Sequence, residues 1–140
     1  MMPEHTPHIP SKFSLAKQDR LKSKKIIDSL FVDGSSQFTY PIKLSYKWLP
    51  LENNDYLPLL FSVTVPKKKI RLAVNRNKIK RRIREAYRLH KFQIQESVTN
   101  GQNQQLVLMF IYITNEIVPY KVIEKSVSHI LKKLANEVTD

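Results

Sequence analysis

The stretch NRNKIKRRIREAYRLHKF, residues 75–92, carries the strongest helical pattern in the sequence. Within it, apolar residues recur at i, i+4, i+7 and i+8, which is the spacing of one face of a helix. These residues are Ile79, Ile83, Ala86 and Tyr87. The pattern predicts a helix over residues 75–92 that is anchored to a core along this stripe.

The rest of this helix and the segment before it are strongly basic. Residues 66–91 hold twelve Lys and Arg and one acid, Glu85. With about 100° per residue, Asn77, Arg81, Arg84 and Arg88 fall opposite the apolar stripe, and the other basic residues flank it. Arginine suits phosphate because its planar fork can bind two oxygens at once. The candidate nucleic-acid-binding residues are Lys67, Lys68, Lys69, Arg71, Arg76, Asn77, Lys78, Lys80, Arg81, Arg82, Arg84 and Arg88.

Length and composition support a single globular domain with a polyanionic partner. The 140 residues include 24 Lys+Arg and 12 Asp+Glu, giving a net charge of +12, and such an excess favours nucleic acid. The chain has no cysteine, which excludes disulfides and Cys-based zinc sites and fits a cytoplasmic protein. Residues 1–12 hold three prolines and no apolar run. We expect them to form a flexible N-terminal tail, not a signal peptide, with the domain over residues 13–140.

The other segments predict one more helix at each end and a small sheet. Residues 23–33 predict a helix that ends at Gly34. Residues 41–48 alternate between apolar and polar side chains, which indicates a half-buried strand. Residues 59–65 predict a second strand, and the segment 49–58 between the two suggests an antiparallel hairpin.

The C-terminal third predicts a buried strand followed by a helix. Residues 106–113 form an unbroken apolar run, typical of a strand buried on both faces, and Pro119 opens an amphipathic helix. Three strands are clear, and a basic strand end before residue 75 makes a fourth possible. The expected fold is a single-domain α+β sandwich of order α-β-β-β-α-β-α, with a mostly antiparallel four-stranded sheet beside the basic helix.

The basic helix favours RNA over a membrane or DNA. Its apolar face is too modest for a membrane-surface helix and better matches a protein core. No segment is apolar enough, over enough residues, to span a bilayer. A strand precedes the helix, which does not fit a helix-turn-helix, and its nearly all-charged face suits phosphates more than base edges. We therefore expect an RNA recognised by shape, with no DNA or membrane partner.

Residues 73–84, AVNRNKIKRRIR, resemble the signature of the bacterial ribonuclease P protein component. The residues that match the signature are Arg76, Asn77, Lys80, Arg81 and Arg84. The resemblance extends to Leu15, Arg20, Leu21, Lys22, Phe31 and Gly34, and to residues 61–69. Two departures are mild: Arg71 and Leu72 stand where many members have a glycine, and Lys78 stands where arginine is common.

The resemblance implies a protein that assists a catalytic RNA. An RNA subunit using Mg²⁺ would remove the 5′ leader of precursor tRNA, and Mg²⁺ would be held by that RNA and the substrate, with no metal site on the protein alone. The protein would bind the RNA through its basic helix and hold the leader in a groove beside the sheet. Phe31 and Tyr46 are the candidate aromatic residues for stacking on the leader. Apart from the RNA, we expect a monomer.

The residues themselves show no catalytic site. The acids are scattered, and neither His90 nor His129 has evident partners in the sequence, so both are expected to be structural or solvated. The chain alone is therefore predicted to be inactive. Two other hypotheses remain open: a ribosomal or other structural RNA-binding protein with no role in cleavage, and a self-sufficient nuclease. The Arg76-Asn77 signature argues against the first, and the lack of an acid/base cluster argues against the second.

Overall fold

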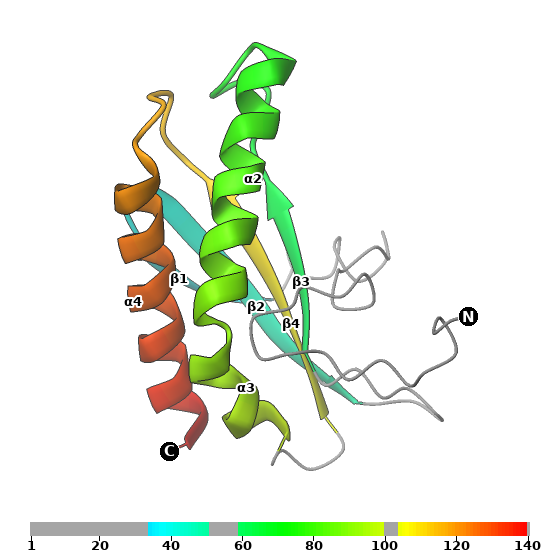
Figure 1. Ribbon diagram of the computed structural model, residues 1–140. Helices are drawn as coiled ribbons and strands as arrows, with labels where there is room; N and C mark the ends of the chain where they lie inside the picture. Colours follow the sequence, from blue (N-terminus) through cyan, green and yellow to red (C-terminus); the bar gives the residue numbers. More distant parts are fainter. Residues whose placement is uncertain (1–33, 51–58, 100–103, 140) are drawn as a thin grey trace, which may run out of the picture.

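The computed structural model describes residues 34–50, 59–99 and 104–139. Three of the predictions lie outside these residues: the flexible tail over residues 1–12, the helix over residues 23–33, and the position of Phe31. The described part consists of one sheet with three helices, all on the same side of it (Figure 1).

The sheet has four strands in the order β1-β2-β4-β3. These are β1 (Ser35–Thr39), β2 (Ile42–Pro50), β3 (Leu59–Thr64) and β4 (Gln104–Tyr112). β1 pairs with β2, and β2 with β4, in antiparallel fashion, whereas β3 and β4 are parallel. The predicted fold class, an α+β domain with a four-stranded and mostly antiparallel sheet, is confirmed.

Two details of the predicted sheet are wrong. The strands β2 and β3 do not form a hairpin, because β4 lies between them. A strand as uniformly apolar as β4 is best placed at the centre of the sheet, where both of its edges and both of its faces are covered. The fourth strand is β1 and not the basic segment before residue 75, where the amides of Lys69 and Ile70 donate to the Pro66 carbonyl in a turn.

The three helices are α2 (Ala73–His90), α3 (Phe92–Thr99) and α4 (Tyr120–Thr139). The predicted basic helix thus begins two residues earlier and ends two residues earlier than its periodicity suggested. The helix α3 was not predicted; it is a polar segment whose described side chains include one fully buried apolar residue, Ile94. The predicted C-terminal helix is confirmed as α4.

The core lies between the helices and the sheet. Ile79, Ile83, Ala86 and Tyr87 are all buried, as predicted. The Tyr87 ring stacks on Phe61 of β3, with 4.2 Å between ring centroids, and meets Phe110 of β4 edge-on at 5.7 Å. A second, smaller cluster around Val107 and Met109 lies on the other face of β4. The prediction that this strand is buried on both faces is therefore confirmed.

The connection from β3 through α2 and α3 to β4 determines where the basic helix lies on the sheet. Figure 1 shows α2 in front of the sheet, with β3 and β4 both running upward and β4 to the left of β3. This crossover is left-handed, the rare hand for a connection between parallel strands. As a result, α2 packs directly beside α4 across the middle of the sheet, and the outer faces of both helices point away from it.

Candidate RNA-binding surface

The turn before α2 is tied to the helix by one of the signature arginines. Arg76 Nη1 donates to the carbonyl oxygens of Ile70, at 3.0 Å, and of Arg71, at 2.6 Å. Since these carbonyls belong to the segment that follows the three-lysine turn, Arg76 holds this segment against the first turn of α2. Its guanidinium, only partly exposed, therefore has a structural role in addition to its charge.

Of the predicted RNA-binding residues, the exposed ones lie in the turn before α2 and in the N-terminal half of α2. The first turn of this fully described helix contains no acidic residue, and its N-cap, Leu72, has no capping side chain. The unneutralised positive end of the helix dipole adds to the field of the neighbouring cations. We call the exposed members of this set the basic surface: Lys67, Lys68, Lys69, Arg71, Asn77, Lys78 and Arg81.

Arg82 is directed to the neighbouring connection and not to solvent. Its Nη1 donates to the carbonyl oxygen of Val118 at 2.7 Å, and the Val118 amide donates to the Tyr112 hydroxyl at 3.2 Å. Tyr112 in turn donates to the Glu116 carbonyl. Burial raises the pKa of Tyr112, so its hydroxyl remains protonated and able to donate. This network fixes the segment between β4 and α4 against α2.

Arg88 is paired with the one acid of the basic stretch. It donates to both Glu85 carboxylate oxygens, from Nε at 3.0 Å and from Nη2 at 2.7 Å. The hydrogen bonds from Arg88 lower the pKa of Glu85, and the same pair raises the pKa of Arg88. Of the remaining predicted residues, Lys80 and Arg84 are half-buried. Lys91, which the sequence count included, is buried at the end of the helix.

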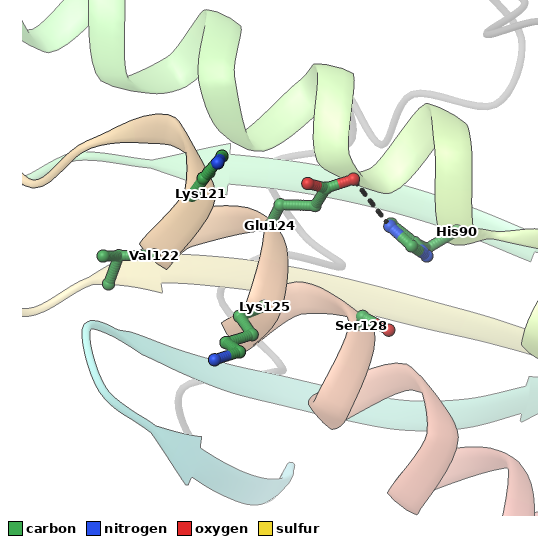
Figure 2. Close-up of a pocket in the computed structure, with 6 residues that line it drawn as sticks. All are labelled: His90, Lys121, Val122, Glu124, Lys125 and Ser128. Carbon is green, nitrogen blue, oxygen red and sulfur yellow. Dashed lines mark hydrogen bonds and ion pairs between the residues drawn. The ribbon is translucent and has the colours of Figure 1, made fainter.

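His90 and Gln93 join α2 and α3 to α4. His90 Nε2 lies 3.1 Å from Glu124 Oε2, and Figure 2 shows the two side chains pointing toward one another across the gap between the helices. Gln93 Nε2 lies 3.1 Å from His90 Nδ1 and donates to Ser128 Oγ at 3.3 Å. Both His90 nitrogens are thus engaged between helices, in agreement with the structural role expected for this histidine.

Tyr46 lies on the helix-covered face of the sheet. Its hydroxyl donates to Glu137 Oε2 at 2.7 Å, and Gln37 Nε2 donates to the same oxygen at 3.2 Å. Burial and this hydrogen bond raise the pKa of Tyr46. The ring is partly exposed at the edge of the core, so its proposed contact with a leader stays a prediction.

The described residues contain no cluster of metal-ligating side chains. Among residues 34–50, 59–99 and 104–139 there is no group of three or more His, Cys, Asp or Glu that could hold a metal ion. None of the helices within these ranges could serve as a membrane span. The fold and the surface thus define a small basic α+β domain with an arginine-rich helix suited to a polyanion.

Comparison with known proteins identifies the family. Residues 15–135 match the family described as Ribonuclease P. The ribonuclease P protein component of Porphyromonas gingivalis is 30% identical over 129 residues, covering 92% of each chain. That of Chlorobium phaeobacteroides is 28% identical, covering 86% of this chain and 88% of the relative. The chain belongs to the bacterial ribonuclease P protein family.

Solved structures agree on the fold. A Staphylococcus aureus ribonuclease P protein mutant with defective mRNA degradation activity superposes with a TM-score of 0.63 at 24% identity, covering 84% of this chain and 89% of that one. Another structure of the ribonuclease P protein from Staphylococcus aureus has a TM-score of 0.56 at 25% identity. As a ribonuclease P protein component, the chain is a subunit of an RNA-based endoribonuclease of tRNA processing. This membership implies association with ribonuclease P RNA.

Proposed function

We propose that this protein binds ribonuclease P RNA through the basic surface of α2 and holds the 5′ leader of precursor tRNA beside the sheet. The observation that supports it most is the arrangement of charge on α2. The helix is anchored through a buried apolar stripe, while Asn77, Lys78 and Arg81 are exposed. Rigid anchoring matters because the cations are then held in place before RNA arrives, which lowers the ordering cost of binding.

In this role the chain positions RNA and leaves hydrolysis to the RNA subunit. Exposed Lys and Arg would neutralise the repulsion between the phosphates of the RNA subunit and those of the leader. The described residues offer no cluster of metal ligands, so we propose that Mg²⁺ acts through the RNA subunit and the substrate. The complex would form in the cytoplasm, without a membrane or DNA partner, and with the protein as a monomer apart from the RNA.

Cleavage of precursor tRNA by a bacterial ribonuclease P RNA at low Mg²⁺ tests this function. We expect the protein to stimulate cleavage strongly and Arg81→Ala with Arg84→Ala to lose most of that stimulation. Tight RNA binding without stimulation would instead support a structural RNA-binding role. Cleavage by the protein in the absence of the RNA subunit would show that the chain itself carries an active site.

A further inference from the structure

The outer face of α4 carries a row of lysines that sequence analysis did not single out. Lys121, Lys125 and Lys132 are all exposed. At about 100° and 1.5 Å per residue, they fall within about 40° of one another along about 16 Å of the helix. In Figure 2, Lys121 extends toward α2 and Lys125 away from it. We call these three residues the α4 lysine row.

The acids of α4 do not neutralise this row. The helix contains two acids, and both point to neighbouring elements: Glu124 contacts His90, and Glu137 accepts hydrogen bonds from Gln37 and Tyr46. Within the described residues, the three lysines of the row make no hydrogen bond or ion pair. Three like charges along one face are therefore left without a countercharge from their own helix.

The row and the basic surface belong to one rigid face. α4 is fixed to α2 and α3 by the Arg82–Val118 hydrogen bond, the His90–Glu124 contact and the hydrogen bond from Gln93 to Ser128. These links are distributed along the helix pair, and both helices lie on the same side of the sheet (Figure 1). Packed helices have axes about 8–10 Å apart, so cations on both outer faces can reach one bound molecule.

The chemistry of this face indicates double-helical RNA. Single-stranded RNA is held by aromatic side chains that stack on its bases, whereas the exposed large apolar residues of α2 and α4 are Val74 and Val122. An RNA duplex presents two rows of phosphates and is recognised by shape. We propose that the α4 lysine row is a second phosphate-binding row that, together with α2, binds a double-helical segment of RNA.

This inference rests on the proposed function of α2 and can be tested separately from it. The full-length protein is titrated with ribonuclease P RNA, and separately with a short RNA duplex and a single strand of equal length, at several salt concentrations. The variants are Lys121→Ala/Lys125→Ala/Lys132→Ala for the row and Arg81→Ala/Arg84→Ala for α2. Lys133→Ala is the control for Lys125→Ala, because Lys133 is also exposed on α4 but lies about 80° away around the helix.

We expect the triple variant to bind the RNA subunit and the duplex at least tenfold more weakly, with the salt slope reduced by up to about 2.7, since each of the three lost phosphate contacts removes about 0.9. Lys125→Ala should weaken binding more than Lys133→Ala. Unchanged duplex binding by the triple variant, or equal effects of these two single substitutions, would overturn the inference. If only the α2 variant loses binding, the proposed function stands without the α4 row; if neither variant does, both fail. Melting curves verify that each variant is folded.

Discussion

Arg82 on α2 donates a hydrogen bond of 2.7 Å to the backbone carbonyl of Val118, just before α4. Its neighbour Arg81 is exposed. Two consecutive arginines of one basic run therefore have different roles, because the helix turns about 100° between them. Arg82 links two elements of the fold, while the exposed Arg81 is a proposed RNA contact.

This difference predicts opposite effects of two alanine substitutions. Arg82→Ala would leave the Val118 carbonyl without its donor and should lower the free energy of unfolding by about 1–3 kcal/mol. Arg81→Ala should change it by less than about 0.5 kcal/mol. Urea unfolding of the two variants measures these changes in the free energy of unfolding. Equal stabilities would show that the Arg82 hydrogen bond contributes nothing net.

Arg81, which is exposed, and the half-buried Arg84 should together determine much of the salt dependence of RNA binding. Arg81→Ala with Arg84→Ala should keep the fold, weaken binding to ribonuclease P RNA, and reduce the slope of log affinity against log salt by about 1–2. Titrations between low and moderate salt measure the slope. An unchanged slope in a folded double variant would mean that these side chains do not contact phosphates.

Glu85 should restrain RNA binding by occupying Arg88. The substitution Glu85→Gln removes the acid of the basic stretch and releases the Arg88 guanidinium, so we expect tighter RNA binding and a salt slope steeper by up to about 1. The control is Glu85→Gln in the background of Arg88→Ala, where the substitution should increase RNA affinity less. An equal gain in both backgrounds would point to net charge alone.

The same pair should make a small pH-dependent contribution to stability. Arg88 lowers the pKa of Glu85 in the folded state, so the unfolded state binds the proton more readily. The stabilisation is present above the unfolded pKa, about 4.3, and is lost as the pH falls through the lower folded value. Stability of wild type and Glu85→Gln, compared from pH 6 to 3, should converge at the acid end. A constant difference across this range would contradict the ion pair.

The aromatic contact between α2 and the sheet should contribute much of the free energy that holds the basic helix in place. Tyr87 is buried against Phe61 and Phe110, and Tyr87→Ala should lower the free energy of unfolding by about 3–5 kcal/mol. Since Tyr87 does not belong to the basic surface, protein that remains folded at low temperature should bind RNA with an unchanged salt slope. A reduced slope in folded protein would show that the anchor also sets the positions of the cations.

The secondary structure of α2 and β4 could be predicted because it depends on the spacing of apolar residues within one segment. The apolar stripe of α2 and the buried run of β4 are patterns within one segment, and both were identified correctly. The polar helix α3 was not predicted because its apolar signal is small: among its described side chains, Ile94 is the one that is fully buried. That burial depends on tertiary packing, since α3 lies against α4 and β4. The β2–β3 hairpin was predicted from proximity along the chain, whereas the actual neighbour of both strands is β4, more than forty residues later.

By itself, the sequence determined that this is a basic α+β protein with an arginine-rich helix, because charge and periodicity are properties of the residues and their order. Tertiary structure alone decided which of those cations remain free. Arg76 and Arg82 donate hydrogen bonds to backbone carbonyls, and Arg88 donates to Glu85, whereas Arg81 is exposed. The Val118 carbonyl that Arg82 reaches lies 36 residues further along the chain, and only folding brings the two together.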